Sequence, residues 1–129
     1  MTGVQTCALP ISGVREAGRP WRVGIRHPDD PERLVLVLAV RDAAVATSGL
    51  YERGAHIVDA RTGAVPTSWR SVTVLAADLA TADAIATAAL AMGETGPEWA
   101  ARRPGCEVAA IDRGDELLTT PGIEARRID

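Results

Sequence analysis

Apolar and polar residues alternate with a period of two in residues 21–27, where every second residue from Trp21 to Ile25 is apolar. This alternation is typical of a half-buried strand, and the Pro-Asp-Asp-Pro sequence that follows has turn chemistry. His27 ends the strand and is expected to face solvent. Residues 34–40 are a continuous apolar run, which predicts a strand covered on both faces. The two segments together predict a β-hairpin.

Three further strands are expected before the first helix. Residues 43–48 form a short strand closed by Gly49, residues 55–59 form another that ends in an Arg-Thr-Gly turn, and residues 71–77 are rich in β-branched side chains. The period then changes from two to that of a helix, because apolar residues recur three and four positions apart between residues 78 and 93.

The expected helix has capping residues at both ends. Asp78 is an expected N-cap and Gly93 an expected C-terminal stop. A second helix is predicted over residues 96–103, and residues 107–113 and 116–120 alternate around a Gly-Asp turn as a closing hairpin. Strands outnumber helices and the connections are short, so the predicted fold class is α+β, with a mainly antiparallel sheet and two helices.

Charge and cysteine content exclude several classes of protein. The 129 residues carry a net charge of −3, which argues against a nucleic acid partner because phosphate neutralisation needs a basic face. No apolar run reaches the length of a membrane-spanning helix. With Cys7 in the unusual leader described next, Cys106 is left alone, so no disulfide framework is expected and Cys106 is predicted to be a buried, inert thiol.

The first eleven residues, MTGVQTCALPI, resemble the translation of a sequencing adapter. We therefore expect residues 1–11 to be a non-native leader that packs against nothing specific. A signal peptide is the alternative, but the segment has neither a basic n-region nor an apolar run of sufficient length. The sequence gives no indication of the compartment in which the protein acts.

Three phrases follow one another in a fixed order between residues 45 and 87. They read Ala-Thr-Ser-Gly at residues 46–49, His-Ile-Val-Asp-Ala-Arg-Thr-Gly at residues 56–63, and Ala-Asp-Ala-Ile-Ala-Thr at residues 82–87. In this order and spacing they resemble the C-terminal part of the ApbE family of FAD:protein FMN transferases. The resemblance implies that residues 12–129 are the C-terminal part of one flavin transferase domain, with FAD as substrate, Mg²⁺ as cofactor and a flavin-accepting protein as partner.

Asp83 and Thr87 are four residues apart on the predicted helix, so their side chains project from one face. Mg²⁺ prefers hard oxygen ligands and completes its shell with water and phosphate, so a carboxylate and a hydroxyl make a reasonable partial site. A structural role is the alternative, since an Asp near a helix start and a helical Thr are both common. The resemblance implies that Asp83 and Thr87 are metal ligands.

His56 lies in the second phrase, where the family pattern has two histidines and a proline and this chain has Ala55 and Ala60 in the places of the first His and the Pro. A lone histidine in a strand is often purely structural. The resemblance implies instead that His56 is the catalytic base, because an imidazole titrates near neutral pH. The family's flavin-contacting positions map onto eight further residues: Thr47, Ser48, Gly49, Ile57, Asp59, Arg61, Thr62 and Gly63.

The implied reaction is Mg²⁺-dependent transfer of FMN from FAD to a Thr or Ser of a target protein. Two alternatives stay open at this point: hydrolysis of FAD to FMN and AMP by a Mg²⁺-dependent pyrophosphatase, and flavin binding without catalysis. Because the resemblance covers only the C-terminal part of the family's domain, we expect the 129-residue chain by itself to be inactive.

Overall fold

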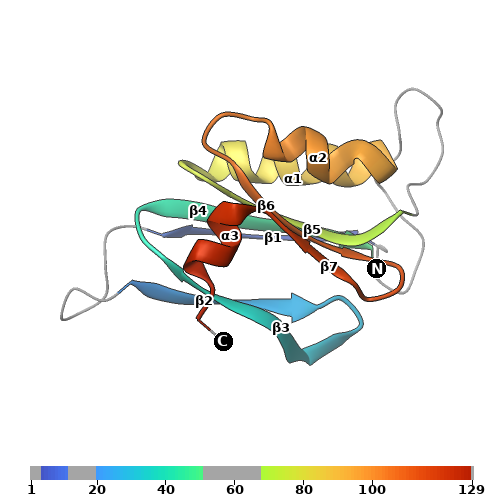
Figure 1. The fold of residues 1–129 in the computed structure, drawn as a ribbon, viewed down its shortest axis with the longest axis horizontal. Coiled ribbons are helices and arrows are strands. Elements are labelled where there is room, and N and C mark those ends of the chain that lie inside the picture. The colour runs from blue at the N-terminus through green and yellow to red at the C-terminus, as the bar shows by residue number, and fades with distance from the viewer. Residues whose placement is uncertain (1–3, 12–19, 51–67, 129) are drawn as a thin grey trace.

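The computed structural model describes residues 4–11, 20–50 and 68–128 and forms three layers (Figure 1). The central layer is a five-stranded antiparallel sheet in the order β1-β4-β5-β6-β7. Its strands are β1 (Val4–Ile11), β4 (Ala43–Leu50), β5 (Trp69–Ala76), β6 (Glu107–Asp112) and β7 (Leu117–Thr119).

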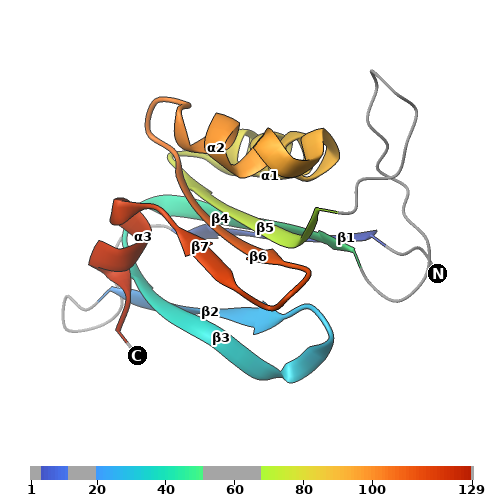
Figure 2. The same cartoon turned by 45° about the vertical axis from the view of Figure 1, so that its right-hand side comes forward.

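The outer layers differ in kind. One face of the sheet is covered by α1 (Leu79–Met92), the short 3₁₀ turn η2 (Gly93–Thr95) and α2 (Gly96–Ala101). The opposite face is covered by a hairpin of β2 (Trp21–His27) and β3 (Asp30–Val40) and by α3 (Pro121–Arg126), as Figure 2 shows. In the described ranges no helix is long and apolar enough to cross a membrane. The predicted α+β class with a mainly antiparallel sheet is confirmed.

Alternation along the central strands divides the apolar residues between two cores. On β5, Val72 and Val74 face the helices, whereas Leu75 faces the hairpin, and all three are buried. The helix-side core is rich in alanine, and the hairpin-side core holds the larger Leu36, Leu38 and Ile123. The helix side of the sheet is therefore packed mainly with small side chains, and the hairpin side mainly with larger ones.

Several predicted elements are confirmed, and three details of the strands differ. The β2–β3 hairpin, α1 with its stop at Gly93, α2 and the β6–β7 hairpin are all present. The prediction that Gly49 closes β4 is wrong, because the strand continues to Leu50 and Gly49 pairs with Ser71. The β3 strand is covered on one face only, and Leu34 on its outer side is 52% exposed. The predicted strand over residues 55–59 lies outside the described residues.

The N-terminal segment also departs from expectation. Residues 1–11 were expected to pack against nothing, yet Val4–Ile11 forms the edge strand β1, which pairs with β4 along its whole length from Val4–Leu50 to Ile11–Ala43. An exposed strand edge accepts any extended segment that can supply backbone donors and acceptors, so pairing depends little on the side chains. The prediction that residues 1–11 pack against nothing specific is therefore wrong. Their assignment as a non-native leader stays a prediction.

A group of charged and polar residues closes one end of the hairpin-side layer. His27 is only 6% exposed, so the expectation that it faces solvent is wrong. Its Nδ1 accepts a hydrogen bond from the Asp29 backbone N–H at 3.1 Å, and its Nε2 lies 3.2 Å from Asp115 Oδ1 in the β6–β7 turn, without hydrogen-bond alignment. Arg70 at the start of β5 forms an ion pair with Asp29, and its Nη1 lies 3.9 Å from Asp115 Oδ1.

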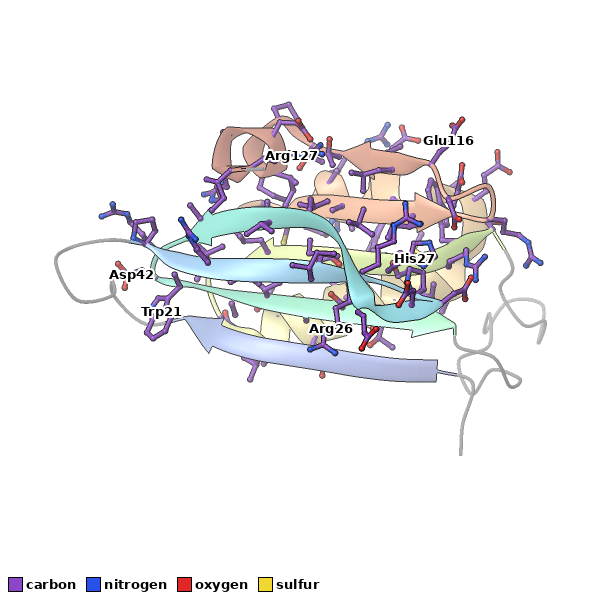
Figure 3. The ribbon with its side chains drawn as sticks, turned by 90° about the horizontal axis from the view of Figure 1, so that it is seen from below. Trp21, Arg26, His27, Asp42, Glu116 and Arg127 are labelled. Atoms are coloured by element: carbon purple, nitrogen blue, oxygen red, sulfur yellow. The ribbon has the colours of Figure 1, made fainter. Side chains whose placement is uncertain are left out.

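We call His27, Asp29, Arg70 and Asp115 the clasp, because they join the hairpin turn, the start of β5 and the β6–β7 turn. Figure 3 shows His27 toward the same end of the structure as Glu116, with Trp21 and Asp42 toward the other end. The Arg70 side chain is 28% exposed, so its charge pairs are less screened than those of fully exposed residues.

The clasp predicts that Arg70 matters more for stability than a comparable surface arginine. Arg70→Ala is expected to lower the free energy of unfolding by about 1 kcal/mol, because it leaves two carboxylates without their shared cation. The matched control is Arg102→Ala, which removes an ion pair with Glu98 whose partners are 71% and 67% exposed, and it is expected to cost less than about 0.5 kcal/mol. Urea unfolding measures both, and equal losses would contradict the prediction.

Candidate active site

The helix that carries Asp83 and Thr87 begins at a strong N-cap. Asp78 has extended backbone angles, and its carboxylate accepts the Thr81 backbone N–H at 2.8 Å and the Thr81 hydroxyl at 2.9 Å. These two hydrogen bonds, the backbone one first, hold the pKa of Asp78 below its ordinary value of 3.8. The cap fixes where α1 starts and therefore which residues face the sheet.

Small side chains bring α1 close to the sheet. The inner face of the helix consists of Ala82, Ala86, Ala89 and Leu90, each 0% exposed. They pack in the helix-side core with Ala44 and Ala46 of β4, among other residues. Alanine against alanine leaves little space between the two backbones, so short polar side chains at the border of this contact can reach one another.

One such pair joins the first and third sequence phrases. Ser48 Oγ on β4 lies 3.2 Å from Thr87 Oγ1 on α1, in hydrogen-bond contact. Ser48 is 0% exposed and Thr87 is half-buried. The structure therefore brings together two of the predicted site residues that are 39 positions apart in the chain.

Asp83 lies one turn before Thr87 on α1 and is exposed. Within residues 4–11, 20–50 and 68–128 it takes part in no ion pair. Its carboxylate is thus accessible next to a half-buried hydroxyl. That arrangement provides two hard oxygen donors on one side of the helix.

The Thr47-Ser48-Gly49 phrase does not form a single surface. Because neighbouring residues of a strand point to opposite faces, Thr47 lies on the hairpin side of β4 while Ser48 lies on the helix side. The Thr47 hydroxyl is hydrogen-bonded to the Thr73 hydroxyl at 2.8 Å, and Thr73 is 1% exposed. Gly49 is buried and pairs with Gln5 on one side and Ser71 on the other.

The second phrase falls outside the described residues. His56, the predicted base, lies there, and so do the flavin-contacting positions Ile57, Asp59, Arg61, Thr62 and Gly63. For the described part of the chain, no group of three His, Cys, Asp or Glu residues could hold a metal ion on its own. A cation at Asp83 and Thr87 would need further oxygen ligands besides these two residues, and water and a substrate's phosphates are among the groups that can supply them.

Two features of the site region escaped prediction from the sequence. The first is that Thr47 and Ser48 lie on opposite faces of β4, which the period-two alternation of a strand could have predicted. The Ser48–Thr87 contact had no sequence signal, because it depends on the distance between α1 and β4. Cys106 agrees with expectation: it is 4% exposed, and burial raises the pKa of its thiol above the ordinary value, which disfavours the reactive thiolate.

Comparison with known proteins places this architecture among flavin transferases. The model of the ApbE family matches residues 8–110. The FAD:protein FMN transferase of Escherichia coli strain K12 is 33% identical over an alignment of 123 residues that covers 87% of this chain and 35% of the relative. That of Vibrio cholerae is 39% identical over 97 residues, covering 67% of this chain and 29% of the relative.

Solved structures agree with the sequence relatives. The flavin transferase ApbE from Vibrio cholerae superposes with a TM-score of 0.75 at 30% identity, over 92% of this chain and 41% of that one. The ApbE protein from Thermotoga maritima gives a TM-score of 0.76 at 26% identity, over 91% and 41% of the two chains. The chain belongs to the ApbE family. It spans about a third of the length of the curated relatives it matches.

The N-cap of the site helix gives a prediction with a definite pH dependence. Asp78→Ala is expected to lower Tm at neutral pH, because it removes both bonds to Thr81. The pKa of Asp78 is lower in the folded state than in the unfolded state. The charged cap therefore contributes its full stabilisation above the pKa of the unfolded state, and this stabilisation is lost as the pH falls through the pKa of the folded state. The Tm gap between the wild type and Asp78→Ala should therefore narrow between about pH 5 and about pH 2.

Asp78→Asn is the matched control, since an amide caps a helix about as well as a carboxylate but does not titrate in this range. Its Tm is expected to stay close to that of the wild type at neutral pH. Thermal unfolding followed by circular dichroism measures all three proteins. A gap for Asp78→Ala that stays constant down to the lowest pH would show that the charged cap is not what stabilises the helix start.

Proposed function

We propose that a protein containing this chain transfers FMN from FAD to a Thr or Ser hydroxyl of a target protein, with Mg²⁺ bound at Asp83 and Thr87. Membership of the ApbE family and the printed names of the relatives support this reaction class. The single structural observation that carries the assignment is the contact between Thr87 and Ser48, which joins two of the three motif phrases at one point.

The donors present fit a magnesium ion. Asp83 offers an exposed carboxylate and Thr87 a half-buried hydroxyl, both hard oxygen ligands on the same side of α1. Neither sulfur nor imidazole lies among these donors, which disfavours zinc and other softer metals. When bound, Mg²⁺ would offset the negative charge that accumulates on the pyrophosphate of FAD during the reaction.

The chain's own residues would position the reactants and move one proton. His56 is proposed to accept the proton of the target hydroxyl, whose oxygen attacks the FMN-side phosphorus of FAD. The bond from that phosphorus to the bridging oxygen breaks, and AMP leaves. Residues of the first two phrases are proposed to line the flavin nucleotide, namely Thr47, Ser48, Gly49, His56, Ile57, Asp59, Arg61, Thr62 and Gly63.

We propose different roles for the residues of the first phrase within that set. Ser48 faces the helix that bears Asp83 and Thr87, and its contact with Thr87 supports a role on the pyrophosphate side of the nucleotide. Thr47 is bonded to Thr73 on the opposite face, so we propose that it acts on the nucleotide site through the position it gives to β4. Close backbone approach is what a glycine at residue 49 permits.

A chimera tests these roles in a complete enzyme. The chain replaces the matched third of the Escherichia coli FAD:protein FMN transferase, and covalent flavin on an acceptor protein is followed by in-gel fluorescence. Asp83→Ala is expected to lower the rate of transfer about 100-fold or more, because the pyrophosphate loses its positioned cation. His56→Ala is expected to slow transfer by about 10²-fold or more while Mg²⁺ binding persists.

The surface variant Arg102→Ala serves as the control and should transfer flavin at the parent rate, since Arg102 is paired only with Glu98 among the described side chains. Each variant is checked by thermal unfolding, so that a misfolded chimera is recognised. Undiminished transfer by Asp83→Ala would overturn the proposed cation site. Loss of Mg²⁺ binding in His56→Ala would assign that histidine to the metal and not to proton transfer.

The 129-residue chain on its own is expected to label no acceptor protein. Its matched relatives are about three times as long, and catalysis by orientation fails when part of the constellation is missing. The measurement is incubation of the purified chain with FAD, Mg²⁺ and an acceptor protein, followed by in-gel fluorescence. A covalently labelled acceptor would show that the residues of this chain suffice.

A further inference from the structure

We infer that Ser48 is a positioning residue for the cation ligand Thr87, and that its Oγ accepts the Thr87 hydroxyl proton when a divalent cation binds. This inference rests on the proposed function, because it assigns a partner to one of the two proposed ligands. It goes beyond that function by giving a separate task to a residue of the first phrase, which would act on the cation through Thr87 and not by contact.

The geometry fits a positioning role. Ser48 Oγ and Thr87 Oγ1 are 3.2 Å apart, and Ser48 is 0% exposed. Ser48 lies in the middle of the sheet, paired with Thr6 of β1 and Val72 of β5, so its backbone is fixed from both sides. The helix bearing Thr87 is in turn held against β4 by buried alanines. The hydrogen bond therefore connects two elements that cannot easily move apart.

The bond also opposes a local alternative. A threonine inside a helix divides between two χ1 rotamers, because its hydroxyl can bond back to a carbonyl of the preceding turn. For Thr87 that carbonyl belongs to the turn containing Asp83. A hydroxyl turned onto the helix backbone would not be directed at a cation beside the Asp83 carboxylate. Ser48 offers the competing partner that keeps the hydroxyl available.

Ligation would fix the direction of a bond that is otherwise ambiguous. Either hydroxyl can donate in the Ser48–Thr87 pair. A cation bound to Thr87 Oγ1 uses an oxygen lone pair and withdraws electron density, so the hydroxyl becomes a better donor and its hydrogen must point away from the metal. Ser48 Oγ is then the acceptor. Partners of this kind orient metal ligands and raise their affinity.

Binding of Mn²⁺ to the chimera with the Escherichia coli enzyme, in the presence of FAD and without an acceptor protein, tests the inference without flavin transfer, and the EPR signal of the free ion reports it. Ser48→Ala is expected to weaken Mn²⁺ binding about tenfold. Ser48→Cys keeps nearly the same volume but provides a poorer acceptor, and it is expected to weaken binding in the same direction. In a Thr87→Val background, Ser48→Ala should cause no further loss, because the residue it acts through is already absent.

The matched control is Thr73→Val, which removes a buried hydroxyl from the other face of the same sheet and should leave Mn²⁺ affinity unchanged. Circular dichroism confirms that each variant is folded, and if Ser48→Ala fails to fold, Ser48→Cys decides. Unchanged Mn²⁺ affinity in a folded Ser48 variant, or an additive loss in the Thr87→Val background, would overturn the inference.

The design separates failure of the inference from failure of the proposed function. If Asp83→Ala weakens Mn²⁺ binding and the Ser48 variants do not, the cation site stands and the positioning role falls. If the unsubstituted chimera binds no Mn²⁺, or Asp83→Ala leaves binding unchanged, the proposed cation site itself is wrong and the positioning role falls with it.

Discussion

The close contact between α1 and β4 is the constraint on which the described part of the site depends. Alanines on both sides of this contact, among them Ala86 on the helix and Ala46 on the strand, are fully buried and leave no room for larger side chains. Serine and threonine hydroxyls reach only a short way from the backbone, so they can meet between a helix and a sheet only where the two approach closely. The apolar core thereby determines the polar geometry: a leucine at such a position would move the helix outward and separate Thr87 from Ser48.

The alternation of β4 then decides what each residue of the first phrase can do. In a strand that is covered on both faces, every side chain points into one of the two layers. Thr47 and Ser48 are neighbours, so they belong to different layers. Each hydroxyl has a partner in its own layer, Thr73 for Thr47 and Thr87 for Ser48, which removes the cost of burying an unpaired polar group. The Thr47-Ser48 pair is continuous in the sequence, but Thr47 makes a structural hydrogen bond on one face of the sheet and Ser48 contacts a proposed site residue on the other.

Prediction from the sequence succeeded where the signal was local and failed where packing decided. The period-two and helical patterns predicted the β2–β3 hairpin and α1, and helical spacing alone places Asp83 and Thr87 on one face. The sequence predicts a strand end at Gly49 because glycine favours turns, but pairing with Ser71 continues the strand. His27 is in phase with the buried Val23 and Ile25, yet its approach to Asp115, which is 88 residues away, has no signal in the pattern. The Ser48–Thr87 contact likewise depends on the distance between α1 and β4, which the hydrophobic pattern of the sequence does not encode.

The clasp and the site lie on opposite faces of the sheet, and β5 connects them. Arg70 is held by Asp29 and lies next to Ser71, which pairs with Gly49 directly beside Ser48. A slip of one residue between β4 and β5 would exchange the faces of Thr47 and Ser48, leaving a bulkier threonine under α1 and no serine hydroxyl near Thr87. The apolar residues of β4 oppose that slip along most of the strand, but its end is polar, from Thr47 to Gly49, and has little apolar patterning to define a register. Arg70 pairs with Asp29 and Asp115, which holds the start of β5 against the hairpin turn and the β6–β7 turn. These charge pairs thereby stabilise the strand that pairs with the polar end of β4, and with it the strand geometry that keeps Ser48 on the helix side.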